Sequence, residues 1–301
     1  MYYLNQFTPG STEKGLEYLH EAVRIDPGEP FAYAGLAQGY IEIAHGPLGT
    51  DDDLAKAEEA VAQAINLDST MAEVYSALGA LYFYKFWKLD KVEAYFVKAL
   101  QLNPNLARTH YHYSWALYAM GRMEEAIAEH KLAVKYDPFN PGHTAWLAGL
   151  YCYDEQYEEA IRVANAAFEI QKDFIISYYI LGRSYLAIGK TEEAIEAHKK
   201  LAELYTWWTA ALGCTYAEVG QVEEAEKILK ELMERDPMDP TTAWQIICLS
   251  SSLGKNDIAF KYLNRKPKHP FLTTLAVMPE YKYLRDDPRY DLVMERFDLP
   301  D

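Results

Sequence analysis

Along most of the chain, apolar and polar positions form repeated blocks that predict pairs of helices joined by short turns. Each block has a small residue followed three positions later by Tyr or Leu, then a polar turn of the form Gly-x-x-Glu-Glu-Ala, then a second helical stretch. Proline closes several of the second stretches, because it cannot continue a helix. The predicted pairs are 29–44 with 51–67, 71–85 with 89–102, 107–120 with 124–136, 141–154 with 158–170, 174–188 with 192–204, 206–219 with 223–235, and 240–253 with 256–264.

The polar turns are near-copies of one another and set the period of the chain. Between the alanines that end the turns, Ala126, Ala160, Ala194 and Ala225, the steps are 34, 34 and 31 residues. Self-similarity at this period is typical of a stacked array of helical hairpins. Such an array offers a long curved surface and not an active-site pocket.

The same pattern divides the chain into a partial first repeat over residues 1–27, a repeat array over 28–266 and a C-terminal capping segment over 267–301. The first part holds only a second helix at 13–25, because the stub before it is shorter than the roughly ten to fifteen residues of a partner helix. This favours a chain that continues upstream, with a short natural cap as the alternative. The last part follows a proline-rich hinge and predicts one or two short helices that cover the last repeat.

The repeats resemble tetratricopeptide repeats at several consensus positions together. In the repeat from Ala107 these are Ser114, Gly121, Ala126, Ala133 and Pro138. In the next clear copies they are Leu181-Gly182, Tyr185, Gly189 and Ala194, and Leu212-Gly213, Tyr216, Gly220, Ala225 and Pro237. The resemblance implies an all-α, right-handed tetratricopeptide solenoid of about seven to eight helix-turn-helix repeats with a short helical C-terminal cap.

A narrower resemblance concerns three features outside the consensus. The long turn after Tyr40, the aromatic turn at Phe86-Trp87 and the string 283–290 near the end look like one bacterial arrangement. There, a tetratricopeptide region ends proteins that carry a nucleotide cyclase, a Ser/Thr kinase or a winged-helix DNA-binding domain upstream. No motif of those effector domains occurs in this sequence. The resemblance therefore implies a regulatory or docking segment and not the effector.

In this family the first helix of each pair lines the concave side, and the resemblance places an aromatic-rich set of residues there. Trp, Tyr and Arg dominate binding hot spots, so this set predicts a face for a peptide or partner helix. The expected ligand-binding residues of the groove are Arg108, Tyr111, Trp115, Tyr118, Tyr153, Tyr179, Arg183 and Trp207. The alternative is that these aromatics only pack between helices. The Lys and Asn with which some members clamp a C-terminal carboxylate are absent from the groove positions.

Charge and cysteine content narrow the classes of partner and compartment. The formal net charge of −16 disfavours nucleic acid and anionic membrane surfaces, whose binding rests on cationic side chains. It suits solubility, or a basic or neutral partner. No apolar run reaches the length of a membrane helix and no signal peptide is visible. Cys152, Cys214 and Cys248 lie in three different repeats without metal or disulfide spacing, which predicts buried reduced thiols in the cytoplasm.

No catalytic, metal or cofactor site is predicted. His130 and His198 stand in the middle of second helices, where structural histidines are expected. The Glu-Glu pairs lie in the first turns of second helices, where negative charge suits the helix dipole. The acidic run after Thr50 lacks the alternating ligands and Gly of a calcium loop and predicts a helix cap instead.

The sequence therefore predicts a non-enzymatic interaction module that binds an apolar, aromatic or basic protein segment, as a regulatory region of a larger signalling protein. The alternative is a sensory region that binds a small molecule or signal peptide and controls an attached effector domain. A cryptic enzyme would need a perturbed acid–base pair in the groove, and none is visible. A further alternative is a homo-oligomer in which the apolar ends of the arrays stack on one another. The segment after residue 267 is a further candidate to occupy the groove.

Overall fold

The computed structural model describes residues 9–45, 50–206, 208–235, 240–265, 269–297 and 299. All regular structure within these ranges is helical, as the repeat pattern predicts. The chain separates into two compact units, unit 1 (Met1–His143) and unit 2 (Thr144–Asp301). None of the described helices is both long enough and apolar enough to span a bilayer.

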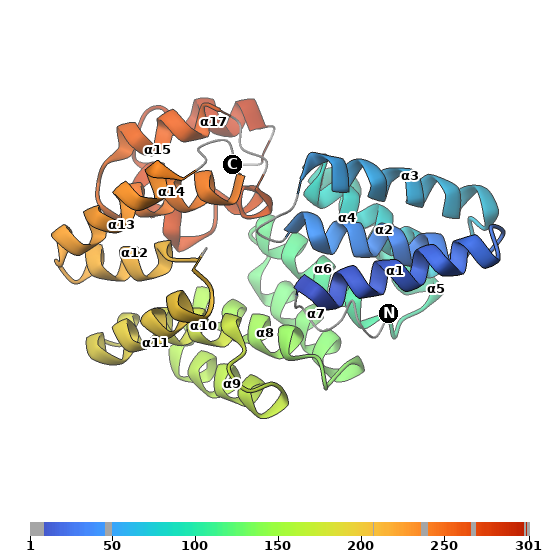
Figure 1. The fold of residues 1–301 in the computed structure, drawn as a ribbon, viewed down its shortest axis with the longest axis horizontal. Helices are drawn as coiled ribbons and strands as arrows, with labels where there is room; N and C mark the ends of the chain where they lie inside the picture. Colours follow the sequence, from blue (N-terminus) through green and yellow to red (C-terminus); the bar gives the residue numbers. More distant parts are fainter. Residues whose placement is uncertain are drawn as a thin grey trace. The chain divides into compact units, whose positions relative to one another are not determined.

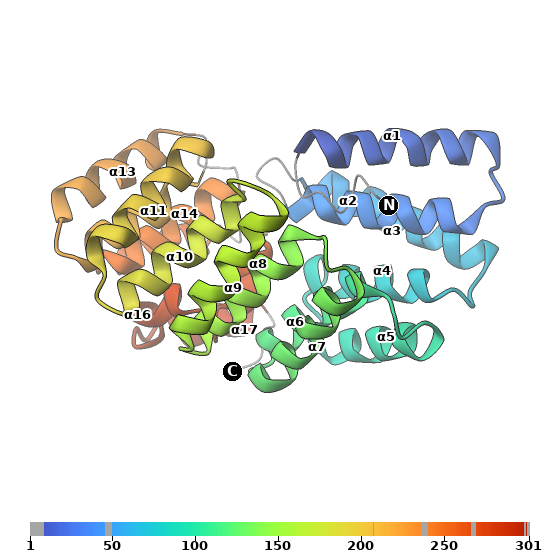
Figure 2. The same cartoon turned by 90° about the horizontal axis from the view of Figure 1, so that it is seen from below.

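Unit 1 is a stack of helical hairpins. Helix α2 pairs with α3, α4 with α5 and α6 with α7, while α1 packs on α2 and the first helices α2, α4 and α6 follow one another (Figures 1 and 2). The bounds are α1 Pro9–Ile25, α2 Pro30–His45, α3 Asp51–Leu67, α4 Ala72–Tyr84, α5 Leu89–Leu102, α6 Ala107–Ala119 and α7 Met123–Tyr136. The division between the units falls in the first turn of α8 (Pro141–Tyr153).

Unit 2 continues the hairpins and adds a short-helix region at its end. Figure 1 shows α12–α13 and α14–α15 side by side, and α10, α12 and α14 contact one another in sequence. The bounds are α9 Tyr157–Ile170, α10 Ile175–Ala187, α11 Thr191–Leu204, α12 Ala210–Glu218, α13 Val222–Glu234, α14 Pro240–Ser252 and α15 Asn256–Leu263. The 3-10 helices η2 Pro270–Thr274 and η3 Pro279–Tyr281 and the helices α16 Lys282–Arg285 and α17 Tyr290–Phe297 follow.

The predicted helices agree with the observed ones to within four residues at every end. Three of the turns close at Gly121, Gly189 and Gly220, whose φ angles of 74°, 77° and 80° favour glycine. At Thr50 the predicted cap is confirmed: the hydroxyl accepts from the amide of Asp53, whose carboxylate accepts from the Thr50 amide.

The alanine that ends each polar turn explains why the repeat motif requires a small residue. Ala126, Ala160, Ala194 and Ala225 are all fully buried, at equivalent places near the start of second helices. A methyl group there allows the two helices of a hairpin to approach closely. A larger side chain would force them apart, because protein interiors have little free volume.

Candidate functional site

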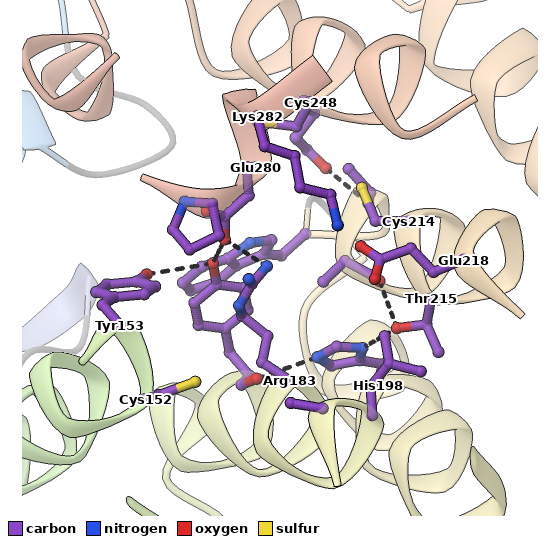
Figure 3. A pocket seen from close by; sticks show the side chains of 18 of the residues that line it. Cys152, Tyr153, Arg183, His198, Cys214, Thr215, Glu218, Cys248, Glu280 and Lys282 are labelled. Atoms are coloured by element: carbon purple, nitrogen blue, oxygen red, sulfur yellow. Dashed lines mark hydrogen bonds and ion pairs between the residues drawn. The ribbon is translucent and has the colours of Figure 1, made fainter. Parts of the chain in front are cut away.

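Three of the predicted groove residues gather in unit 2. Tyr179 and Arg183 are four residues apart on α10, so their side chains leave the same side of the helix. The hydroxyl of Tyr153, at the end of α8, is 3.4 Å from the Tyr179 hydroxyl, and its ring centre is 6.0 Å from the Arg183 guanidinium (Figure 3). We call the side formed by α8, α10, α12 and α14 the first-helix face, because each of these helices is the first of its pair.

Tryptophans extend this face towards α14. The Trp208 ring stacks on Tyr179 with the ring centres 5.1 Å apart, and Trp244 meets Trp208 edge-on at 6.3 Å. Trp207, which the sequence analysis placed in the groove, lies outside the described residues. Sequence reasoning missed Trp208 because α12 begins at Ala210, four residues later than expected, and the repeat register does not apply to the irregular stretch before it.

A stretch of the chain itself, residues 269–281, lies on the first-helix face, and we call it the groove segment. The imidazole of His269 stacks on Trp244 with ring centres 4.6 Å apart and planes 1° from parallel. Phe271 packs on the same tryptophan at 5.1 Å. Tyr281 is fully buried; its hydroxyl accepts from Trp244 Nε1 at 2.9 Å and donates to the Phe271 carbonyl oxygen at 3.1 Å.

The polar anchor of the groove segment is Glu280. Its Oε1 lies 2.6 Å from Arg183 Nη1, and the Tyr179 hydroxyl donates to the same oxygen. Burial is the largest single influence on the Arg183 guanidinium and lowers its pKa, but the Glu280 carboxylate together with Tyr179, Cys152 and Tyr153 outweighs burial and holds that pKa well above its ordinary value. Burial raises the pKa of Tyr179, so its phenol stays protonated and donates. The sequence analysis gave the segment after residue 267 as a candidate to occupy the groove but did not single out Glu280.

A cavity of about 360 Å³ lies beside this ion pair, between the first helices and η3 (Figure 3). Glu280 and Lys282 line it from the C-terminal side, and all three cysteines of the chain, Cys152, Cys214 and Cys248, line it from the helices. The thiols are buried and unpaired, as predicted. Burial raises the pKa of Cys214 to about 12 and that of Cys248 well above its usual range, so both remain protonated.

His198 reaches the cavity wall but has a structural role, as its place in the repeat predicts. Its Nε2 donates to the Tyr179 carbonyl oxygen at 3.1 Å and its Nδ1 accepts from the Thr215 hydroxyl at 2.7 Å. Burial lowers its pKa to about 4, so the imidazole is neutral near pH 7. Gly182 makes room for the ring, because a Cβ atom there would lie 2.3 Å from it.

In the part of the chain that the structure describes, no three His, Cys, Asp or Glu side chains are arranged to hold a metal ion. Among the titratable groups that line the cavity, burial shifts the pKa of Cys214 and Cys248 upwards and that of His198 downwards. None of these three groups has a pKa near neutrality. The arrangement is suited to holding a segment or ligand by packing and hydrogen bonding.

The other predicted groove residues lie on α6 in unit 1, where Arg108 belongs to a buried polar cluster. It pairs with Glu42 of α2, and the two side chains are 11% and 7% exposed. His112 Nε2 lies 3.4 Å from the same Glu42 oxygen, and His112 Nδ1 lies 3.1 Å from the Tyr84 hydroxyl. Glu42 was not among the residues that the sequence analysis singled out.

Tyr111, Trp115 and Tyr118 of α6 also have packing partners. The Tyr111 ring lies 5.3 Å from that of His143 and 5.5 Å from that of His130, and the Trp115 and Tyr118 rings meet edge-on at 5.8 Å. All three side chains are buried. Their role in ligand binding stays a prediction.

Three of the hairpins match the model of a known protein family. The family model described as tetratricopeptide repeat matches residues 107–140, 175–205 and 210–238. These segments correspond to α6–α7, α10–α11 and α12–α13, the hairpins with the clearest Gly-x-x-Glu-Glu-Ala turns.

Two relatives extend the similarity over most of the chain. The transcriptional regulator HilA of Salmonella typhimurium (strain LT2) is 25% identical over 240 residues, which are 77% of this chain and 42% of HilA. The TPR repeat-containing protein YpiA of Bacillus subtilis (strain 168) is 27% identical over 241 residues, 75% of this chain and 52% of YpiA. The chain thus spans about half, or less, of the length of each of these relatives.

Solved structures agree on the fold. A chain of the APC/C hetero-tetramer Cut9–Hcn1 superposes with a TM-score of 0.64 at 14% identity, covering 98% of this chain and 53% of that one. Yeast Tom70 gives a TM-score of 0.51 at 15% identity, covering 95% of this chain and 59% of that one. Together with the three matched repeats, these structures show that the chain has the fold of a tetratricopeptide-like helical solenoid.

Proposed function

We propose that this chain is a non-enzymatic interaction module that binds a segment of a protein partner on its first-helix face, the side that is concave in this family. The observation that carries the proposal is the groove segment. The face provides an extended stretch of polypeptide with aromatic stacking, a buried hydrogen bond from Trp244 and an ion pair from Arg183. These are the residue types that supply most of the binding free energy in protein interfaces.

A regulatory role within a longer, cytoplasmic protein is part of the same proposal. It is supported by the similarity to HilA, a transcriptional regulator of which this chain matches 42%. The net charge of −16 argues against the chain itself holding nucleic acid or an anionic membrane. The neutral His198 and the protonated thiols of the cavity support a binding role over catalysis.

A peptide-display screen on two matched variants tests the proposal. Arg183→Gln removes the cation of the first-helix face, whereas Arg162→Gln removes an exposed arginine from α9, a second helix of the same unit. Binders should be lost with Arg183→Gln and kept with Arg162→Gln, since only the first substitution changes the binding face. Circular dichroism confirms that both variants are folded. Binders that both variants retain would place recognition elsewhere and reject this face.

The cavity beside Glu280 favours a second candidate function, the sensing of a small molecule. A volume of about 360 Å³ with aromatic walls and a few polar groups is within the range of small-ligand sites. Thermal unfolding in the presence of a metabolite collection tests it, with the cavity-filling variant Cys214→Leu as the control. Compounds that raise the Tm of the wild type but not of this variant would support sensing. Equal shifts in both proteins would reject the cavity as their site.

A further inference from the structure

The C-terminal region of unit 2 has two parts that are held in different ways. Residues 282–297, which we call the cap, pack at the end of the array: Arg289 Nη1 lies 2.8 Å from Asp257 Oδ1, and its guanidinium covers the Phe260 ring at 4.3 Å. The groove segment precedes the cap and lies on the first-helix face, where a partner would bind. Its departure would break the hydrogen bonds from Arg285 of the cap to the Leu275 and Met278 carbonyl oxygens but would not remove the contacts of Arg289 with α15.

The groove segment fits this face incompletely. The cavity beside Glu280 removes packing partners from the surrounding side chains. Glu280 Oε2 and Arg183 Nε are both buried without a hydrogen-bond partner among the described residues. Buried polar atoms without partners cost free energy, and so does a buried ion pair that is only partly hydrogen-bonded. An occupant that fills the cavity and satisfies these atoms would therefore bind more favourably than the groove segment does.

We propose that the groove segment is an internal placeholder, which a partner segment of matching chemistry displaces. This inference rests on the proposed function and deepens it by naming the partner's chemistry. The partner carries a carboxylate that pairs with Arg183 and, directly after it, an aromatic side chain that takes the place of Tyr281. A second aromatic residue upstream takes the place of Phe271 on Trp244.

The net charge of the chain also influences which partners can bind. The chain carries a net charge of −16, so a partner with many acidic residues is repelled before it reaches the face. The single carboxylate is recognised locally by Arg183, whose side chain is only 20% exposed, so that charge–charge attraction is stronger than in bulk water. The expected partner is therefore an aromatic segment with one acidic residue in an otherwise neutral or basic stretch.

Thiol alkylation of the full chain reports on whether the groove segment leaves. All three cysteines line the cavity beside Glu280 and are buried, so N-ethylmaleimide should react with them faster when the groove segment leaves. Glu280→Gln should speed alkylation about ten-fold, as expected for the loss of one charge-assisted hydrogen bond. Phe271→Ala weakens the other end of the segment and should act in the same direction. Glu295→Gln, at an exposed position of α17, is the matched control and should leave the rate unchanged.

A fluorescein-labelled peptide with the sequence of residues 269–285 tests exchange directly by anisotropy. It should bind the Glu280→Gln chain about ten-fold more tightly than the wild type, because the weakened internal segment leaves the face open more often. The same peptide with Gln in place of its glutamate should bind the variant at least several-fold more weakly than the unsubstituted peptide.

Three results would overturn the inference, two of them obtained without display binders. One is alkylation at wild-type rate in both Glu280→Gln and Phe271→Ala, with both variants folded by circular dichroism. The other is the absence of peptide binding to wild type and variant alike; either result makes the groove segment a permanent structural element. Display binders that depend on Arg183 but do not compete with the peptide would also reject displacement, while leaving the proposed function intact.

Discussion

Units 1 and 2 each hold a Glu–Arg pair among aromatic side chains on first helices, but the glutamate comes from different parts of the chain. In unit 1, Arg108 of α6 pairs with Glu42 of α2, a helix of the same stack. In unit 2, Arg183 of α10 pairs with Glu280, which lies beyond the last hairpin. Helix packing holds the first carboxylate, and a short 3-10 turn presents the second. The origin of the carboxylate, more than the chemistry of the pair, therefore distinguishes a fixed polar core from a face that can exchange its occupant.

Removing each carboxylate gives the largest expected effect and tests this distinction. Glu42→Ala leaves Arg108 and His112 buried without their acid and should lower the free energy of unfolding by about 3–5 kcal/mol. Glu280→Ala should cost only about 1–2 kcal/mol, because Arg183 borders a cavity that water can enter. Urea titrations of the two variants measure the difference. Equal losses would mean that both pairs are fixed parts of the core.

A substitution at the small-residue position of the repeat is expected to have the next largest effect on stability. Ser114 in unit 1 and Gly182 in unit 2 are 68 residues apart, two repeat periods. The Ser114 hydroxyl is 2.8 Å from His130 Nδ1, whereas a Cβ atom at Gly182 would collide with His198. Gly182→Ser should therefore destabilise unit 2 by about 1–3 kcal/mol through overpacking. A stable Gly182→Ser protein would show that unit 2 tolerates the unit 1 arrangement.

One buried histidine in each unit, His130 in unit 1 and His198 in unit 2, contributes in the same direction to the pH dependence of stability. Burial lowers the pKa of His130 to about 3 and that of His198 to about 4. The unfolded chain binds a proton near pH 6.5, so stability is complete above that pH and decreases as the pH falls towards the folded values.

Between pH 7.5 and pH 5 each histidine should thus cost about 2 kcal/mol. His130→Gln and His198→Gln should each remove that share of the pH dependence, as urea titrations at the two pH values would show. If only one variant showed a smaller pH dependence of stability, the two units would differ in the packing inside their hairpins as well as in the segments that cover their first helices.

A substitution in the cap is expected to have the smallest effect on stability. Arg289→Ala removes an exposed ion pair with Asp257 and a half-exposed one with Asp287, and ion pairs near the surface contribute little to stability. The thiol alkylation rate should remain at the wild-type value, since the groove segment keeps its contacts with the first-helix face. Faster alkylation in this variant would show that the cap and the groove segment move as one.

The sequence predicts the hairpins because each carries its own signals. The polar turn and the buried alanine recur in every clear copy, a closing proline follows several of them, and the resulting helices match the structure to within four residues. The stretch before Ala210 departs from the period, and there the expected helix began too early. Position counting did not single out Trp208, which stacks on Tyr179, and Trp207, which it placed in the groove, lies outside the described residues.

The site was only partly predictable, because its acid comes from outside the repeats. Tyr153, Tyr179 and Arg183 are close together, as first-helix positions suggest, but no periodicity identifies Glu280. A signal for the shared cavity did exist. Cys214 and Cys248 are 34 residues apart, one repeat period, so stacking alone places them on neighbouring first helices.

The groove segment is joined to the array at both of its ends, with five residues between Leu263, where α15 ends, and His269, and none between Tyr281 and α16. A ligand tethered so closely acts at an effective concentration of about millimolar or above. A soluble partner must compete with the groove segment at this effective concentration. A weak binder at a low cellular concentration therefore does not displace the segment. The tether thereby sets a threshold: the face responds to a partner that is tight, abundant or itself attached nearby.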